Sequence, residues 1–125
     1  MKQVRPLSPH LQIYKPQITS ILSIMHRLTG IGLSVGTILI VLWITSLSLG
    51  ESFYEYYIVF IKSLFGKLIL IAFTFALNYH LSNGIRHLFW DLGYGFELDA
   101  VFKSGLAVLF SALVLTSLVW IYILF

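Results

Sequence analysis

Three long apolar stretches, separated by two shorter polar segments, dominate the pattern along the chain. They predict membrane-spanning helices over residues 20–49, 64–87 and 103–125, since a span needs about 20 apolar residues. Residues 1–19 carry all three prolines, and each proline opposes a helix that would continue from the residue before it. We therefore expect an all-α, integral membrane fold, a single domain of three transmembrane helices. Residues 1–19 would form an irregular arm on the membrane surface or against a partner.

The two segments between the helices carry residue types that gather at membrane interfaces. Residues 50–63 are rich in tyrosine and glutamate, and we expect a turn there, part of which can form an early turn of the second helix. Residues 88–102 hold three carboxylates and two glycines, which predicts the second loop.

Small residues indicate where the helices can approach one another closely. In the first helix, Gly32 and Gly36 have the G-x-x-x-G spacing that brings spanning helices together. In the third helix, Gly105, Ala112 and Thr116 can face other helices. Because no lysine, arginine, histidine or carboxylate follows residue 103, we expect the third helix to contribute packing only.

The composition supports a membrane protein and excludes several kinds of chemistry. Hydrophobic residues make up 58% of the 125 positions and charged residues only 10%, against roughly 25% charged residues in soluble domains. Three spans leave no room for a soluble catalytic domain, so elaborate chemistry must come from partners or a cofactor. The absence of cysteine excludes disulfides, thiolate nucleophiles, zinc–thiolate sites and the usual iron–sulfur ligands. The net charge of +3 concerns orientation and does not indicate nucleic-acid binding.

The cations are distributed unevenly between the two sides of the membrane. With three spans, the N-terminal arm and the second loop share one side, which therefore holds most of the lysines and arginines. The positive-inside rule then places the N-terminus in the cytoplasm, or in the matrix of a mitochondrion. The cations on this side are Lys2, Arg5, Lys15, Arg27, Arg86 and Lys103, and those on the other are Lys62 and Lys67.

The first candidate site is formed by Ser23, His26 and Arg27, where the first helix enters the bilayer. Ser23 and Arg27 begin a stripe of small and polar residues along one side of this helix. One interpretation is a helix-packing face with Arg27 reaching to lipid phosphates. The other is that Arg27 pairs with a buried anionic or carbonyl ligand while Ser23 donates a second hydrogen bond.

The second candidate is His80, about 9 Å inward from the end of the second helix at 1.5 Å per residue. It shares a predicted helix face with Asn83, Gly84 and His87. A buried ionisable residue in a span is a functional hypothesis, and a neutral imidazole is a good axial ligand for haem iron. Gly84 would leave room for a flat macrocycle. A structural histidine hydrogen-bonded to a neighbouring helix is the alternative, and a six-coordinate haem would need a further ligand from His26 or another subunit.

A third cluster leads into the second loop. We expect Arg86 and Asp91 to be interfacial charges, with Trp90 as an aromatic belt residue. This favours anchoring or docking for the cluster, which also includes His87, and leaves direct cofactor contact as the alternative.

Two motifs carry a resemblance to a known family. Residues 23–29 match S-x-x-H-R-x-T, preceded by Arg-Pro at residues 5–6, and residues 80–93 match H-x-x-x-G-I-R-H-x-x-W-D-x-G. Residues 8–16 read S-P-H-L-x-I-Y-K-P. At these motifs the chain closely resembles the cytochrome b (large membrane-anchor) subunit of succinate dehydrogenase, respiratory Complex II, of the alphaproteobacterial and mitochondrial type. The resemblance covers essentially the whole chain.

The resemblance implies half of a heterodimeric helix bundle, shared with a second small membrane-anchor subunit, that anchors the flavoprotein and iron–sulfur subunits. Electrons from succinate would reach ubiquinone through FAD and iron–sulfur clusters held in the partners, so this chain alone would not be catalytic. It implies that His80 is the axial ligand of haem b and the metal site, the other histidine coming from the second anchor. Ser23 and Arg27 match residues that line the quinone pocket, and His26 and Arg27 would lie near the haem propionates.

This identification leads to a mechanistic expectation and a competing one. Ser23 would donate a hydrogen bond to a quinone carbonyl, and Arg27 would stabilise negative charge on the quinone in a site shielded from water. The competing hypothesis is a haem-free structural anchor or small helical channel subunit with packing histidines. No cleavable targeting peptide is apparent, which favours a bacterial inner membrane, with the mitochondrial inner membrane as the alternative.

Overall fold

The computed structural model describes residues 16–124 as four helices, with no strand in that part of the chain. They are α1 (Ile18–Leu49), α2 (Glu51–Lys62), α3 (Leu64–Asp91) and α4 (Leu98–Leu124). Three of them, α1, α3 and α4, are long and apolar enough to cross a membrane. The all-α membrane fold is therefore confirmed. Most of the predicted N-terminal arm lies outside the described residues.

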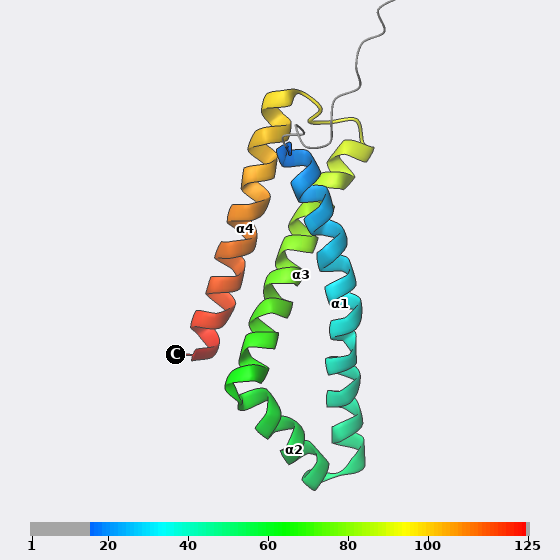
Figure 1. Cartoon of the computed structure of the whole chain (residues 1–125), viewed down its shortest axis with the longest axis vertical. Coiled ribbons are helices and arrows are strands. Elements are labelled where there is room, and N and C mark those ends of the chain that lie inside the picture. The colour runs from blue at the N-terminus through cyan, green and yellow to red at the C-terminus, as the bar shows by residue number, and fades with distance from the viewer. Residues whose placement is uncertain (1–15, 125) are drawn as a thin grey trace, which may run out of the picture.

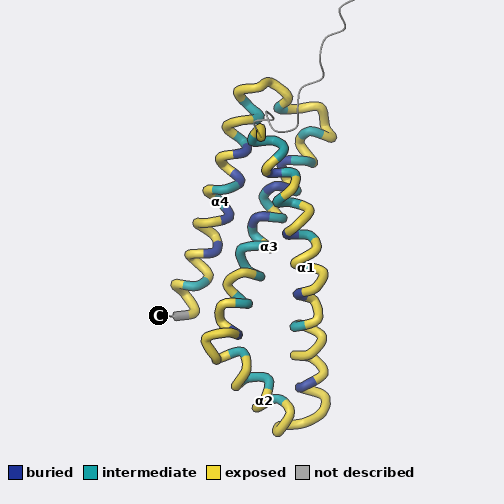
Figure 2. The backbone as a smooth tube through the Cα atoms, in the orientation of Figure 1, coloured by how far each residue is buried: buried dark blue, intermediate teal, exposed yellow. Residues whose placement is uncertain are grey.

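The three long helices alternate in direction, and α3 lies between the other two (Figure 1). All three meet at the end of the bundle where α1 begins, and most of the buried positions lie toward that end (Figure 2). The core at this end consists of Leu22, Tyr79, Val108 and Ala112. The Tyr79 hydroxyl donates to the Leu22 carbonyl oxygen at 2.8 Å, which joins α3 to α1. This end of the bundle is therefore its best-packed part.

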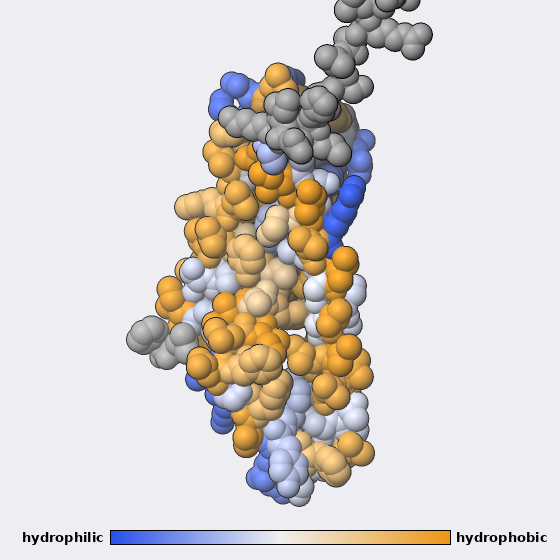
Figure 3. Space-filling view, viewed as in Figure 1, coloured by the Kyte–Doolittle hydropathy of each residue, from blue (hydrophilic) through white to orange (hydrophobic). Residues whose placement is uncertain are grey.

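Elsewhere the helices expose most of their large hydrophobic side chains. Hydrophobic residues cover most of the visible face between the two ends (Figure 3). A soluble protein rarely leaves so much apolar surface without a partner. A membrane protein need not bury this surface in its own core, because lipid can cover it.

The stretch expected as an interfacial turn, residues 50–63, is mostly a separate helix. The half-buried positions of α2 are Tyr54, Tyr57, Ile58 and Ile61, at the spacing of one helical face. This face packs on α1, and the Tyr57 hydroxyl donates to the Leu39 carbonyl oxygen at 3.1 Å. Burial raises the pKa of Tyr57 above its ordinary value. The prediction of a turn was wrong because Tyr54 and Tyr57, which suit a membrane interface, also occupy the half-buried face of an amphipathic helix.

The second loop is shorter than expected. Helix α3 continues to Asp91 and α4 begins at Leu98, so the connection covers residues 92–97 and not 88–102. The connection contains two glycines with positive φ, and the Trp90 Nε1 donates to the Gly95 carbonyl oxygen at 3.1 Å. On the far side of the loop, Asp99 lies in the first turn of α4, where a carboxylate favours helix formation. Because of these features, α3 ends and α4 begins within residues 88–102, the segment that was expected to be a loop.

Small and polar residues hold α3 against its neighbours. Gly36 faces the Phe73 ring so closely that a side chain would collide with it, whereas Gly32 has nothing within 4 Å among the described residues. The predicted close approach therefore occurs at one of the two glycines. Three hydrogen bonds between pairs of side chains join α3 to α4, as is common between membrane helices. They link Asn78 to Thr116, Ser82 to Ser111 and Arg86 to Ser104.

The small residues of the third span face the other helices, as predicted. Gly105, Ala112 and Thr116 are buried against the other helices. A Cβ at Gly105 would lie 2.8 Å from a methyl carbon of Leu22, so α4 approaches α1 closely at this point.

Candidate functional site

Three histidines meet between α1 and α3, near the end of the bundle where α1 begins. The rings of His26 and His80 stack with centroids 3.8 Å apart and planes 10° apart. The His87 ring lies 5.4 Å from that of His26, tilted by 40°. Folding thus brings His26 of one motif onto His80 of the other, although 54 positions separate them.

One ring nitrogen of His80 is hydrogen-bonded to two oxygen atoms. This nitrogen, Nδ1, lies 3.2 Å from the His26 carbonyl oxygen and 3.2 Å from the Thr29 Oγ1. A carbonyl oxygen only accepts, so these contacts assign the ring proton to Nδ1. Nε2 then keeps its lone pair and makes no hydrogen bond within the described part of the chain. A metal-binding histidine usually has this arrangement, with one nitrogen held by a carbonyl and the other directed to the metal.

Two glycines leave space beside the stacked rings. A Cβ at Gly30 of α1 would lie 3.2 Å from the His80 Cε1, and the nearest atom to one at Gly84 of α3 is the His26 Cε1, at 3.9 Å. Because α1 and α3 are antiparallel, each histidine lies opposite the glycine that follows the other histidine by one turn. The sequence predicted this role for Gly84 but not for Gly30.

His26 and His80 do not face each other as two axial ligands do. Axial ligands point their nitrogens at one metal from opposite sides of a macrocycle, whereas these rings lie face to face. The Nδ1 of His26 is buried without a hydrogen-bond partner among the described residues. The stacked arrangement therefore makes His26 a neighbour of His80 and leaves it with an unused polar atom.

Ser23 and Arg27 lie on α1 beside this cluster without joining it. Ser23 is half-buried and Arg27 is exposed. Within residues 16–124, no other side chain forms a hydrogen bond or ion pair with either of them. Within that part of the chain, both groups therefore remain available to a ligand or a partner chain.

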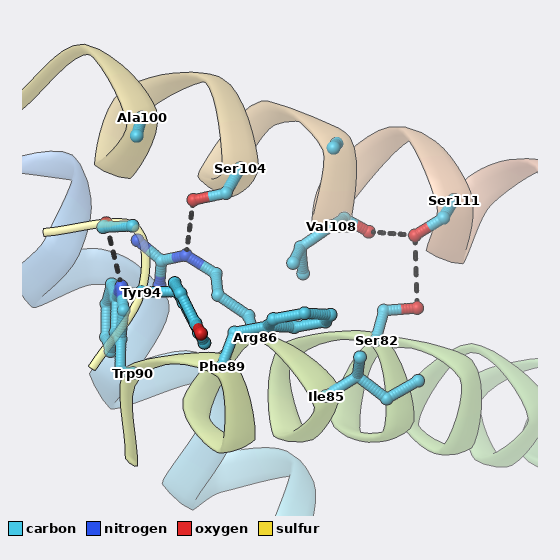
Figure 4. A pocket seen from close by; sticks show the side chains of 12 residues that line it. Ser82, Ile85, Arg86, Phe89, Trp90, Tyr94, Ala100, Ser104, Val108 and Ser111 are labelled. Carbon is cyan, nitrogen blue, oxygen red and sulfur yellow. Dashed lines mark hydrogen bonds between the residues drawn. The ribbon is translucent and has the colours of Figure 1, made fainter. Parts of the chain in front are cut away.

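Arg86 is not the interfacial charge that its place near the end of α3 suggested. Its side chain is buried, and its guanidinium lies 3.9 Å from the centre of the Trp90 ring. Nε donates to the Ser104 Oγ at 3.0 Å (Figure 4). One terminal nitrogen donates to the Val101 carbonyl oxygen at 3.1 Å. No carboxylate pairs with it among the described residues, where the one ion pair joins exposed Lys103 and Asp99. Arg86 therefore links α3 to α4.

Asn83 lies one turn from His80 on the continuous helix α3, as expected. Its side chain is fully buried, and its Oδ1 accepts from an Arg86 terminal nitrogen at 3.4 Å. Asn83 and Arg86 thus take part in the packing between helices. Beside them, an apolar groove of about 500 Å³ runs between α3 and α4, lined by Arg86 and three serines among others (Figure 4).

Comparison with known proteins agrees with these motifs. Residues 1–119 match the family described as succinate dehydrogenase/fumarate reductase transmembrane subunit. The succinate dehydrogenase cytochrome b556 subunit of Rickettsia typhi is 45% identical over 117 residues, which cover 94% of this chain and 91% of that protein.

Two further relatives come from a plant and another bacterium. The cytochrome b560 subunit of Marchantia polymorpha is 46% identical, over 90% of this chain and 85% of its own. The cytochrome b556 subunit of Paracoccus denitrificans is 40% identical, over 91% and 88%. The match runs through both motifs and all three spans, and the chain therefore belongs to the transmembrane subunits of the succinate dehydrogenase and fumarate reductase family.

Proposed function

We propose that this chain is the haem-binding anchor subunit of a succinate:ubiquinone oxidoreductase. His80 Nε2 is the axial ligand of haem b, and a second small membrane-anchor subunit supplies the other ligand. Ser23 and Arg27 contribute to a ubiquinone site, and the flavoprotein and iron–sulfur subunits dock on the same side of the membrane. Electrons from succinate then reach the quinone pool, which links the TCA cycle to the respiratory chain.

The observation that carries this proposal is the environment of His80. The His26 carbonyl oxygen holds the proton of the ring on Nδ1 and leaves Nε2 free. Gly30 and Gly84 remove side chains from the space around the two rings. These features fit an axial ligand. A histidine kept only for packing would gain from having both nitrogens hydrogen-bonded. Haem, when bound, supplies a one-electron redox centre.

The stacking of the histidines supports a ligand from another chain. His26 presents its ring face to His80, so it does not reach the far side of a macrocycle bound at His80. Its buried Nδ1 has no partner within residues 16–124, which fits a donor to an anionic group such as a haem propionate. The exposed Arg27 guanidinium, on the next residue, fits the same role.

The quinone site is supported by the free polar groups of α1. The Ser23 hydroxyl can donate to a quinone carbonyl, and the Arg27 guanidinium can stabilise negative charge that develops as the quinone is reduced. Neither group is engaged within the described part of the chain. The uneven distribution of cations supports a cytoplasmic N-terminus in a bacterial inner membrane, or a matrix N-terminus in a mitochondrion.

A reduced-minus-oxidised absorption spectrum of the purified complex tests the haem assignment. The wild-type complex should show a haem b spectrum that His80→Leu abolishes or alters. His87→Leu is the matched control, since His87 lies in the same cluster without stacking on His80. An unchanged spectrum in His80→Leu would assign the ligand elsewhere. Absence of haem from the wild-type complex would favour the haem-free anchor.

Quinone reductase activity of the fully assembled complex tests the quinone assignment. Ser23→Ala and Arg27→Ala should each lower the activity by about 100-fold, in the range of losses when a group stabilising developing charge is removed. Ser34→Ala, on the same helix with a hydroxyl bonded to the Gly30 carbonyl oxygen, should leave it unchanged. Full activity in both site variants would refute this part of the proposal.

A further inference from the structure

Thr29 makes a contact that its place in the first motif did not explain. It is buried at 8% exposure on α1, one turn from His26, and its Oγ1 lies 3.2 Å from the His80 Nδ1. Besides the His26 backbone, it is the only group of the described residues that is hydrogen-bonded to this ring.

The donor and acceptor roles follow from the other contacts of Thr29. Its hydroxyl has one proton, which is shared between the Met25 and His26 carbonyl oxygens, both at 2.9 Å. The His80 Nδ1 therefore faces the lone pairs of Oγ1, and Oγ1 accepts a hydrogen bond from it. Since the His26 carbonyl also accepts from Nδ1, both partners of that nitrogen are acceptors.

When another group accepts a hydrogen bond from one ring nitrogen of a histidine, the ligand strength of the other ring nitrogen changes. The hydrogen bond increases the electron density of the imidazole and makes Nε2 a stronger ligand. Groups that accept a hydrogen bond from the second ring nitrogen of a metal-binding histidine have the same effect. Hydrogen bonds around an axial ligand are also one of the means by which a protein sets the potential of haem iron. A stronger donor favours the oxidised iron and lowers the reduction potential.

We propose that Thr29 is a positioning residue for the haem ligand: together with the His26 carbonyl oxygen it holds the proton of His80 on Nδ1, and so leaves Nε2 available to the iron and lowers the potential of the iron. The inference rests on the haem-binding role proposed for His80. It gives Thr29 a chemical function separate from helix packing, because the methyl group of Thr29 could pack without any hydroxyl.

The test compares Thr29→Val with wild type in the purified complex, by haem content, absorption spectrum and redox titration. Valine keeps the shape and removes the acceptor. We expect haem to remain bound while the ratio of affinities for oxidised and reduced iron falls about tenfold. For a one-electron couple this is a positive shift of about 59 mV.

Two further variants separate the hydroxyl from other effects. Thr29→Ser keeps the acceptor and should keep the wild-type potential. Thr37→Val makes the same change elsewhere on α1, where the hydroxyl only donates to the Ser34 carbonyl oxygen at 2.6 Å, and should change nothing.

The outcomes distinguish this inference from the proposal on which it rests. If His80→Leu removes the haem spectrum but Thr29→Val has the wild-type potential and spectrum, the role of Thr29 is overturned and that of His80 stands. If wild type holds no haem, or His80→Leu keeps its spectrum, both fail.

A loss of haem in Thr29→Val would be resolved by Thr29→Ala and Thr29→Ser. Retention in the serine variant alone supports a requirement for the hydroxyl. Loss in the serine variant as well overturns the inference, because the methyl group would then be what matters.

Discussion

Replacing Arg86 with lysine keeps the positive charge but removes the planar group that joins α3 to α4. The guanidinium donates to the Ser104 Oγ and the Val101 carbonyl oxygen while it covers the Trp90 ring. A lysine ammonium is a compact charge on a flexible stem and cannot reproduce these contacts together. Arg86→Ala removes all of them.

The size of the effect follows from these contacts. A hydrogen bond between membrane helices contributes about 0.6–1.7 kcal/mol, and a cation over an aromatic ring about 0.5–2 kcal/mol. With two such hydrogen bonds and one ring contact, Arg86→Ala should lower the free energy of unfolding by about 2–5 kcal/mol. Arg86→Lys should cost about half as much, because one donor and the charge remain.

The assay is a denaturant titration of the purified complex in detergent, followed by helical circular dichroism. Lys103→Ala is the control, since Lys103 is exposed in its pair with Asp99, and such surface pairs contribute about 0–1 kcal/mol. The reasoning is refuted if Arg86→Lys is as stable as wild type, or if Arg86→Ala costs no more than the control. Either result would mean that the guanidinium does not link the two helices.

Three other changes test separate contacts. Gly36→Leu should lower the free energy of unfolding by about 1–3 kcal/mol through overpacking, whereas Gly32→Leu, in open space, should be neutral; equal effects would contradict the assigned helix approach. Gly30→Ala should displace the His80 ring by its new methyl group and alter the haem spectrum, and an unchanged spectrum would show that this space is not needed. The raised pKa of Tyr57 means that the stability it contributes is complete below its ordinary pKa and is lost as pH rises through the raised value; Tyr57→Phe should remove this alkaline loss in a pH titration of unfolding.

The sequence predicted the helices correctly wherever a long apolar stretch was present. The three spans have the expected order, and α1 ends at Leu49 as predicted. The short helix α2 was missed although its periodicity is present in the sequence, because its tyrosines also suit a membrane interface. The end of α3 was placed several residues too early and the start of α4 several residues too late, since capping contacts such as that of Trp90 with Gly95 depend on the folded loop.

The sequence alone determined that the chain spans a membrane, that cysteine-based chemistry is absent, and that His80 is a candidate functional residue. These conclusions rest on composition, on hydropathy and on the cost of burying an ionisable group, none of which depends on how the helices pack. Only the tertiary structure decided that His26 stacks on His80, that Thr29 meets its Nδ1, and that Arg86 is buried against α4. Such contacts depend on how each helix is rotated about its axis and how far it is shifted along its neighbour. Packing between residues far apart in the chain determines both quantities.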